Sequence, residues 1–508
     1  MRALASVCPA LLLGLAPLLC GVQAVGAAEV PLQNFSGVWI NKLPLAQVRP
    51  FQGGALPLTA EGKSRYEATR SDRNSGQQVD EARHLCLPEG MPRALNSPYP
   101  MQIMVTPGQV TFFHEANRAY RMVHLDRPHA DPGVWDPTYM GEGTARYSSG
   151  VLVIDSLNYK GGRVFLDETG LPVSDALHLT EQLRLLDNGQ TLEDLVTIDD
   201  PRNYSRTWQL RFVFARRDDV QVRTDWVCGE AHRPLPSLRK ASKPTAPAVA
   251  TQPGAALTVE QLALNGYWRG DRRPLPGAAH IAAEPTTADG PPLGPGGIPS
   301  VILTAALPRL QPWAADFRRR FLAAEAQGQQ QRTPGNLCLP YAIPGTGVPG
   351  GPAYNLQLLI EPRHVTFLYQ ENRQIRIARI GGQHPPHWAP SWLGDSIAQW
   401  EGNTLVVDTI GFNDTNLIGD TVPFTRALHI VQRLSVEDGK LVDRAVFTDP
   451  GTFDRAFEAV HRFEAAEPFQ EYLCAEDNRE GGVPTASGKP TPYRLPGATT
   501  TAEGLRTR

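Results

Sequence analysis

The chain lacks the short motifs that mark the common catalytic and nucleotide-binding classes. It contains no G-x-S-x-G nucleophile elbow, no P-loop and no H-E-x-x-H, and the G-x-G-x-x-G sequence at 345–350 follows Pro344 and contains Pro349, unlike a Rossmann turn from strand to helix. Hydrolase and nucleotide-dependent functions therefore have little sequence support. It also contains no C-x-x-C or C-x-x-C-H sequence, which are the usual signals of redox and haem chemistry. We therefore expect no cofactor, and the sequence by itself does not identify a substrate.

The chain carries little net charge and has no long apolar run after its N-terminus. Its formal charge is −3, so no basic field exists to attract nucleic acid or anionic lipid, and we expect neither as a partner. With 41% apolar residues, 20% charged residues, 46 glycines and 46 prolines, the composition is typical of a globular protein rich in turns. A length of 508 residues is enough for two domains that each bury a core.

The N-terminus is organised like a secretory signal peptide. Arg2 precedes an apolar run over residues 3–19, and small residues follow over 24–28. We interpret residues 1–28 as a cleaved signal peptide and expect a periplasmic or secreted protein without a membrane span. A lipoprotein signal at Cys20 is the alternative, but the bulky Leu19 stands where such a signal has a small residue.

A motif that occurs twice organises the rest of the chain. Trp400–Phe412 has the sequence W-E-G-N-T-L-V-V-D-T-I-G-F, and Tyr147–Tyr159 is a weaker copy that begins 253 positions earlier. Each is typical of a tight turn followed by a strand with an aspartate near its end. We infer two copies of one unit, at 35–233 and 264–478. A Pro/Ala-rich linker at 234–263 joins them, a Pro/Gly-rich insertion interrupts the second copy at 271–299, and 479–508 is a disordered tail.

Strand signals recur within both copies. Turn sequences such as Pro107-Gly108 and Asp438-Gly439 separate apolar segments at a spacing of roughly 8–12 residues. We expect eight or nine short antiparallel strands per copy, the last at 220–227 and 469–473, and one helix that begins after Thr59 or at Pro312. The pattern predicts an all-β fold with two tandem antiparallel domains, lipocalin-like in general architecture. We favour an up-and-down barrel over a sandwich, because closure leaves no exposed sheet edge.

The second copy of the motif resembles an uncharacterised family of secreted bacterial proteins. The resemblance rests on W-E-G-N-T-L-V-V-D-T, on L-H-I-V-Q-R-L downstream and on the Cys-x-Glu that ends each copy. The first copy departs from it, with Ser148-Ser149-Gly150 in place of Glu401-Gly402-Asn403. The resemblance implies the compartment and the architecture, and it implies no activity.

Four cysteines remain after removal of the signal peptide, and they allow three pairings. The tandem symmetry favours one disulfide within each copy, worth roughly 2–4 kcal/mol each in an oxidising compartment. The expected pairs are Cys86–Cys228 and Cys338–Cys474.

A pair of Asp and His residues repeats in the two copies. Asp155 ends one strand and His178 begins the next, and Asp408 and His429 repeat this arrangement. As cross-strand or diagonal neighbours at a barrel rim, such residues could act in proton transfer, or they could form a hydrogen bond that fixes the loop between the strands. Glu181 is a further catalytic candidate, although it faces away from His178 on a regular strand.

Other polar and aromatic residues are candidates for ligand binding. Arg121 and Arg376 match each other and could bind a ligand carboxylate, or they could be solvated or pair with a neighbouring acid. The second copy has the sequence H-P-P-H, which places His384 and His387 about 9 Å apart on a polyproline II helix, so the two do not easily share a metal ion and we expect no metal site. Trp388 and Trp392 follow them, and we interpret this segment as a wall over a barrel mouth, with His129, Trp135 and Tyr139 at the comparable place in the first copy.

Three functions fit these features. The first is a periplasmic binder of a small apolar or aromatic molecule, and the second is a cofactor-free isomerase, dehydratase or lyase that uses the Asp and His pair. The third is a cell-envelope interaction protein. For either of the first two, we expect the site at the barrel end formed by the loops 159–176 and 412–427, because loops on a rigid barrel commonly carry function. The sequence leaves the oligomeric state open.

Overall fold

The structure is a computed structural model, and it describes most of the chain in segments. The described residues are 31–77, 80, 82, 87–131, 134–162, 164–224, 256–270, 301–302, 308–329, 339–340, 355–370, 373–386, 389–414, 417–418 and 422–473. The predicted signal peptide, insertion and tail lie outside them, as do His387, Trp388 and the four cysteines of the predicted disulfides. None of the helices in the described segments is long and apolar enough to cross a membrane.

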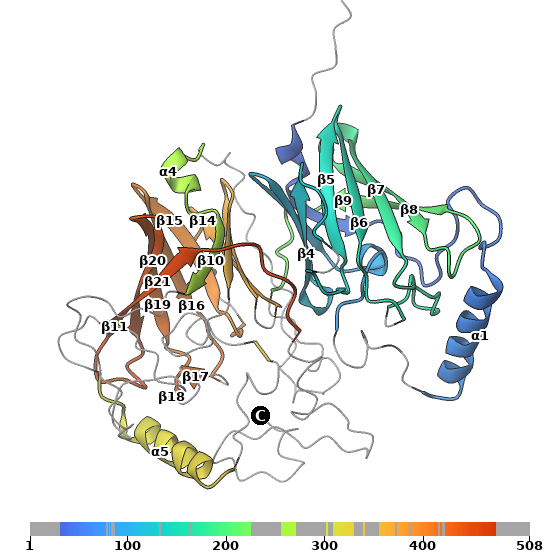
Figure 1. The fold of residues 1–508 in the computed structure, drawn as a ribbon. Helices are drawn as coiled ribbons and strands as arrows, with labels where there is room; N and C mark the ends of the chain where they lie inside the picture. The colour runs from blue at the N-terminus through green and yellow to red at the C-terminus, as the bar shows by residue number, and fades with distance from the viewer. Residues whose placement is uncertain are drawn as a thin grey trace, which may run out of the picture.

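Two closed β-barrels follow one another in the described chain (Figure 1). In each barrel nine strands follow in sequence order, and the last strand pairs with the first. The predicted all-β fold with two tandem barrels is confirmed. The first barrel contains β1 (Gly37–Asn41), β2 (Met101–Thr106), β3 (Gln109–His114), β4 (Ala119–Leu125), β5 (Glu142–Ser148), β6 (Val151–Leu157), β7 (His178–Leu186), β8 (Thr191–Asp199) and β9 (Trp208–Arg216). The second contains β10 (Gly266–Gly270), β12 (Leu356–Ile360), β13 (His364–Tyr369), β14 (Gln374–Ile380), β15 (Asp395–Glu401), β16 (Thr404–Ile410), β19 (His429–Glu437), β20 (Lys440–Thr448) and β21 (Phe457–Ala465).

Short elements decorate the barrels. The strand β11 (Val301–Ile302) adds to β21, and β17 (Leu417–Ile418) and β18 (Val422–Pro423) form a small hairpin after β16. Helix α1 (Ala60–Asn74) follows β1, and its N-cap Thr59 accepts a hydrogen bond of 2.9 Å from the Gly62 amide, as predicted. Helix α5 (Pro312–Ala326) is the counterpart in the second barrel. Helix α4 (Val259–Leu262) lies in the predicted linker, with Leu257 before it packed against the second barrel. Four short 3-10 helices lie at Leu32–Phe35, Arg93–Asn96, Ala116–Arg118 and Asp187–Gly189.

Each barrel contains one parallel strand pair, which the predicted antiparallel pattern did not include. The parallel pairs are β4–β5 and β14–β15. A closed ring with an odd number of strands cannot alternate in direction all the way round, so one neighbouring pair must run parallel. A parallel pair needs a connection that returns along the barrel. The segments 126–141 and 381–394 are these connections, and we refer to them as the crossovers.

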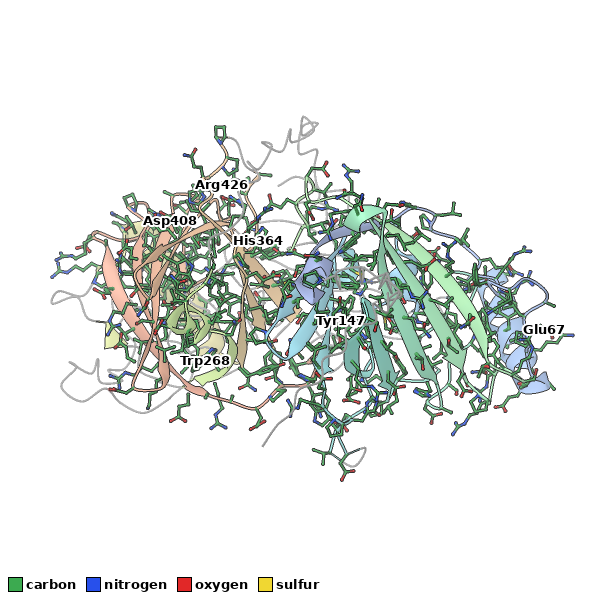
Figure 2. The ribbon with its side chains drawn as sticks, turned by 90° about the horizontal axis from the view of Figure 1, so that it is seen from above. Glu67, Tyr147, Trp268, His364, Asp408 and Arg426 are labelled. Atoms are coloured by element: carbon green, nitrogen blue, oxygen red, sulfur yellow. The ribbon has the colours of Figure 1, made fainter. Side chains whose placement is uncertain are left out.

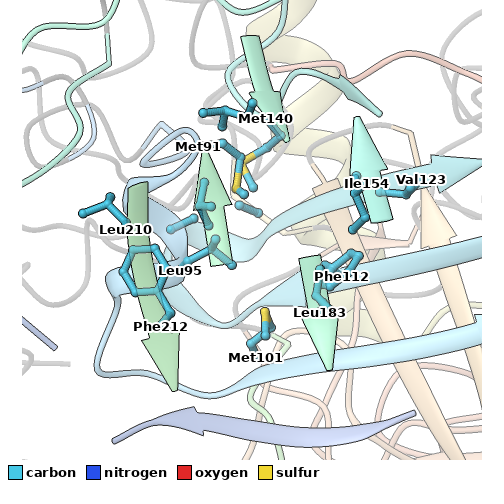
Figure 3. Packing of buried hydrophobic residues seen from close by; sticks show 14 of the residues in the cluster. Met91, Leu95, Met101, Phe112, Val123, Met140, Ile154, Leu183, Leu210 and Phe212 are labelled. Carbon is cyan, nitrogen blue, oxygen red and sulfur yellow. The ribbon is translucent and has the colours of Figure 1, made fainter. Parts of the chain in front are cut away.

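The two barrel interiors differ in how their apolar residues are connected. The first interior holds one continuous cluster, in which Phe112, Val123, Ile154 and Leu183 gather from four strands (Figure 3). The second interior holds two separate clusters, one around Phe447 and Phe457 and the other around Phe367 and Leu405. The first strands keep an equivalent contact, since Trp39 Nε1 donates to the Phe35 carbonyl and Trp268 Nε1 donates to the Leu264 carbonyl, each at 3.0 Å.

The barrels pack side by side through the outer faces of β2–β4 and β12–β14 (Figures 1 and 2). Residues at equivalent places meet there, including Phe113 from the first barrel and Leu368 from the second. The strands predicted at 220–227 and 469–473 are not formed in their described parts. Val222 and Phe469 from these segments instead fill the interface between the barrels, because β9 and β21 already close the two rings.

Candidate functional site

The repeated Asp and His residues lie on the outer wall of each barrel. In the first barrel Asp155 pairs in register with Thr180, so His178 is its diagonal neighbour, and Asp155 Oδ2 lies 2.8 Å from His178 Nε2. Along β6 the residues Leu152, Ile154 and Ser156 are buried, whereas Asp155 is partly exposed. Side chains alternate between the faces of a strand, so Asp155 points outward. We had expected it at the rim or just inside the barrel.

The crossover of the first barrel adds a second histidine to this pair. His129 Nε2 lies 2.8 Å from Asp155 Oδ1, and His129 Nδ1 bonds to Glu142 Oε2. The result is a row of alternating acids and histidines, Glu142–His129–Asp155–His178, which we call the first acid–histidine chain. It ties the crossover to β5, β6 and β7.

The second barrel repeats this arrangement with an additional cation. Asp408, labelled in Figure 2, has its Oδ1 2.9 Å from His429 Nε2 and 3.1 Å from His384 Nε2. His384 Nδ1 lies 2.6 Å from Asp395 Oδ2, and Arg379 binds both oxygens of Asp395 at 2.8 and 2.9 Å. His384 is therefore part of the second acid–histidine chain, where we had placed it in a ligand-binding wall. The terminal acids Glu142 and Asp395 were missed, although they share the offset of 253 positions with Asp155 and Asp408.

Within the first acid–histidine chain, neighbouring groups stabilise the charged forms of His129 and Asp155. Burial lowers the pKa of His129, but the hydrogen bonds and charges of Glu142 and Asp155 outweigh burial and raise it above the ordinary value. Burial raises the pKa of Asp155, but the hydrogen bonds to His129 and His178 outweigh burial and lower it. A cavity of about 30 Å³ beside Glu142, lined also by Trp135, has room for a water molecule or two and is far smaller than a typical ligand pocket. The first acid–histidine chain can therefore fix the position of the crossover and bind a proton.

Glu181 and Arg121 form an ion pair inside the first barrel. Arg121 Nη1 donates to Glu181 Oε2 at 2.9 Å and Arg121 Nη2 donates to Oε1 at 2.6 Å, while Nη2 also bonds to Ser156 Oγ at 2.5 Å. Both charged side chains are almost completely buried. Glu181 is thus separated from His178 by the sheet and does not join the acid–histidine chain. Burial, followed by the charge of Glu181, raises the pKa of the nearby Asp194 well above its usual range.

The second barrel has an equivalent arginine but no equivalent ion pair. Gln432 occupies the place of Glu181, and its Oε1 accepts a hydrogen bond of 2.6 Å from Arg376 Nη1. The amide of Gln432 donates to Asp443 Oδ2 at 2.6 Å. Arg376 Nε, Arg376 Nη2 and Asp443 Oδ1 are buried and have no hydrogen-bond partner among the described residues. His461, opposite Asp443 on β21, likewise has both ring nitrogens buried without such a partner.

These side chains form a continuous layer across the second barrel. Gln432 lies between Ile430 of one apolar cluster and Leu434 of the other, and Asp443 lies between Ala445 and Leu441 in the same way. In the first barrel Phe212 stands in the place of His461 and belongs to the continuous apolar cluster. We call it the polar layer, and its members are Arg376, Thr409, Gln432, Asp443 and His461.

Burial also shifts the protonation of the polar layer. It raises the pKa of Asp443 to about 6, although the Gln432 hydrogen bond and the charge of Arg376 act in the opposite direction. It lowers the pKa of His461 to about 4. Near neutral pH the layer therefore contains the Arg376 cation, a mostly ionised Asp443 and a neutral His461.

The remaining predicted residues do not add to either site. Trp392 is buried and packs against Leu393 and Leu339, so it is not an exposed surface for ligand stacking. His387 and Trp388 lie outside the described residues. In the described segments no group of three or more His, Cys, Asp or Glu side chains is arranged to hold a metal ion. In the described part of 412–427, Phe412, Ile418 and Phe424 are buried in one apolar cluster of the second barrel.

Comparison with known proteins shows no family for this chain. No protein-family model matches the chain, and a search of curated proteins gives no match. Among solved structures the chain is similar to a crystal structure of a mutant of the fluorescent protein UnaG, with 14% sequence identity over 23% of this chain and 73% of that chain and a TM-score of 0.15. A likeness at this level carries no argument about function.

Proposed function

We propose that this protein binds a small molecule and that the binding site is the interior of the second barrel. The polar layer carries the proposal, because it places unpaired donors and acceptors in the middle of a barrel that is otherwise lined by apolar residues. Small-molecule sites combine an apolar lining with a few converging polar groups. Barrels of this size commonly have room for side chains or for one small ligand.

The energetics of the layer support a bound partner. A buried donor or acceptor without a hydrogen bond costs about 1–3 kcal/mol, and more when the group is charged. Arg376 cannot lower this cost by losing its proton, because a guanidinium remains charged in proteins. The unpaired atoms of Arg376, Asp443 and His461 therefore favour a molecule that supplies both an acceptor and a donor.

The first barrel has a different role in this proposal. Its interior apolar cluster is continuous, and Glu181 already pairs with both terminal nitrogens of Arg121. Arg121 Nε and both carboxyl oxygens of Asp194 are also buried without a hydrogen-bond partner among the described residues, but the charge of Arg121 is already paired with that of Glu181. We infer that the first barrel supports the second, against which it packs, and does not itself hold a ligand.

Proton-transfer catalysis by the acid–histidine chains is the second candidate that we considered. His178 and His429 are partly exposed and bonded to carboxylates, which favours it. However, both residues lie on outer walls, and the cavity beside the first chain accommodates only water. We therefore assign the chains to fastening the crossovers.

A thermal-shift screen of small molecules tests the proposal. The wild-type chain is compared with a double variant, Thr409→Val with His461→Phe, which makes two members of the layer apolar and restores the phenylalanine that stands at position 212 in the first barrel. Compounds that raise the melting temperature of the wild type and leave that of the folded double variant unchanged support the proposal. If every active compound stabilises both proteins equally, the ligand does not bind in the second barrel.

A further inference from the structure

We propose that the ligand of the second barrel carries a carboxylate, which binds Arg376 as Glu181 binds Arg121 in the first barrel. This inference rests on the proposed function and adds the chemical class of the ligand. Its basis is a comparison of two interiors built on the same plan within one chain.

Most polar interior positions are the same in the two barrels. Each arginine lies over a phenylalanine ring, Arg121 at 5.7 Å from the centroid of Phe112 and Arg376 at 3.8 Å from that of Phe367. Each arginine also contacts a hydroxyl, and an aspartate lies close by. The matched pairs are Arg121 and Arg376, Ser156 and Thr409, and Asp194 and Asp443.

Two of the positions that differ change the groups around Arg376 and Asp443. Gln432 replaces Glu181, so a neutral amide oxygen stands where the first barrel has a carboxylate. His461 replaces Phe212, as the strand register shows, since the two lie opposite Asp443 and Asp194 respectively. The second barrel thus lacks the anion that pairs with the arginine in the first, and it gains a hydrogen-bonding ring beside the same place.

The unpaired atoms of Arg376 have the geometry that a carboxylate requires. Gln432 occupies Nη1, and the two free nitrogens are Nε and Nη2. These two nitrogens form one edge of the planar guanidinium, and their N–H bonds run parallel. A carboxylate accepts two parallel hydrogen bonds from such an edge, and this paired arrangement is shorter and stronger than a bond between neutral groups.

Charge balance is consistent with the same ligand. Without a ligand, Arg376 has Asp443 as its nearest anion, with Gln432 between them. An added carboxylate would place two anions in a buried layer, and Asp443, whose pKa is already raised to about 6 by burial, can then take up a proton. Gln432, Arg376 and the neutral His461 are the groups that face Asp443. The bound state would then resemble the first barrel, which holds Arg121, the Glu181 carboxylate and Asp194 with its raised pKa.

The apolar clusters limit the size of the ligand. The described residues on both sides of the polar layer are closely packed and apolar, with Phe447 on one side and Phe367 on the other. A short monocarboxylate fits this setting, with an apolar body that bears a group able to hydrogen-bond with His461. A long fatty acid does not fit, because its chain would have to displace one of the two clusters.

Isothermal titration of the full chain with carboxylates and their amides tests the inference. The probes are acetate, propionate and benzoate, each compared with acetamide, propionamide or benzamide in chloride-free buffer. We expect a carboxylate to bind about 100-fold more tightly than its amide, since two charge-assisted hydrogen bonds are lost in the amide. We also expect proton uptake near pH 7, measured as a dependence of the binding enthalpy on the buffer.

Two variants at Gln432 distinguish a loss of binding that is caused by an internal carboxylate from one that is caused by removal of the amide. Gln432→Glu supplies an internal carboxylate and is expected to weaken binding of the preferred probe at least about tenfold. Gln432→Met keeps a similar volume without a charge, and is expected to retain the preference for carboxylate over amide. Retention of full affinity in Gln432→Glu would overturn the inference, and so would loss of the preference in Gln432→Met.

The controls distinguish this inference from the proposed function. If chloride or nitrate competes as strongly as an equal concentration of carboxylate, the site binds anions in general, and the carboxylate assignment is overturned. If amides or other neutral molecules bind as tightly as carboxylates, and binding disappears in the Thr409→Val and His461→Phe double variant, the ligand class is wrong and the second barrel still binds a small molecule. If the probes bind equally to the double variant and to Gln432→Glu, they do not bind in the second barrel, and the proposed function itself is wrong.

Discussion

Replacement of Glu181 by glutamine is expected to destabilise the first barrel strongly. The change gives the first barrel the residue that the second has naturally, and it removes the anion bound to Arg121 at 2.9 and 2.6 Å. Removal of one member of a buried ion pair costs about 3–5 kcal/mol, because a buried charge is left uncompensated. The glutamine oxygen can keep one hydrogen bond to Arg121, as Gln432 does with Arg376. We therefore expect a cost near the lower limit, about 3 kcal/mol.

The cost should also depend on pH in a defined direction. In the wild type, burial and then the charge of Glu181 raise the pKa of Asp194. Without Glu181 this pKa falls, and Asp194 can ionise to become the partner of Arg121. The raised pKa of Asp194 lowers stability as the pH rises toward it, and this loss is smaller in the variant, in which the pKa of Asp194 is raised less. The destabilisation of Glu181→Gln is therefore expected to be larger at pH 5 than at pH 8.

Urea unfolding followed by circular dichroism and tryptophan fluorescence measures this cost. Two barrels need not unfold in one step, so the transition that shifts is identified by both probes. The matched control is Glu193→Gln on the outer face of the neighbouring strand, where Glu193 pairs with the exposed Arg211 and the expected change is below about 1 kcal/mol. A change for Glu181→Gln as small as for the control, or one that does not vary with pH, would refute the account of the buried pair.

Three further predictions concern the crossover, the interface and the cysteines. Because the pKa of His129 is raised, its contribution to stability is fully present below about pH 6.5 and is lost as the pH rises through the folded pKa. The protection of segment 126–131 against hydrogen exchange, relative to the intrinsic rate, should therefore fall as His129 loses its proton. His129→Asn should remove this pH dependence of the protection. Burial raises the pKa of the interface residue Glu361 to about 7, although hydrogen bonds from Ser36 and a backbone amide oppose burial. Stability should consequently fall as the pH rises from about 4.5 through about 7, and Glu361→Gln should flatten this fall in thermal melts; an unchanged slope would contradict the assignment. Non-reducing peptide mapping should find the pairs Cys86–Cys228 and Cys338–Cys474, and a bond between Cys86 and Cys338 would contradict the predicted pairing.

Local sequence patterns were sufficient to predict the architecture. Turn residues such as Gly108 and Gly439 adopt positive φ at the ends of hairpins that the sequence marked, and Thr59 caps the helix that was expected after it. The strands β5 and β15 were missed, because their parallel pairing depends on closure of a ring with nine members. Neither the apolar periodicity nor the turn residues of one segment contain that information.

The position of the Asp and His pair within the barrel could not be derived from local pattern. Four apolar residues, Val151 to Ile154, precede Asp155. The sequence therefore does not show which alternate residues of this strand face the core. The two acid–histidine chains also need histidines from the crossovers, whose path follows from the parallel pair. The terminal acids could have been found by the offset of 253 positions that they share with the aspartates.

The buried arginines were recognised as a matched pair, but their surroundings were not predicted. Arg121 and Glu181 are 60 positions apart and meet only because their strands face each other across the barrel interior. Charged residues are rarely buried in full, so burial is not the first expectation for either. The substitution of Gln432 for Glu181 was visible in the alignment of the two copies, but its meaning depends on this contact.

Nuclear magnetic resonance of the arginine side chains offers the most direct test of the central claim. In the full chain labelled with ¹⁵N-arginine, the Nε–H resonances of Arg121 and Arg376 can be assigned with the variants Arg121→Lys and Arg376→Lys. On titration with the preferred carboxylate, we expect the Arg376 Nε–H resonance to shift saturably downfield, because this N–H gains a charge-assisted hydrogen bond, while the Arg121 resonance stays in place. An unchanged Arg376 resonance at a concentration that saturates calorimetric binding, or equal shifts of both arginines, would contradict binding of the ligand at the polar layer of the second barrel.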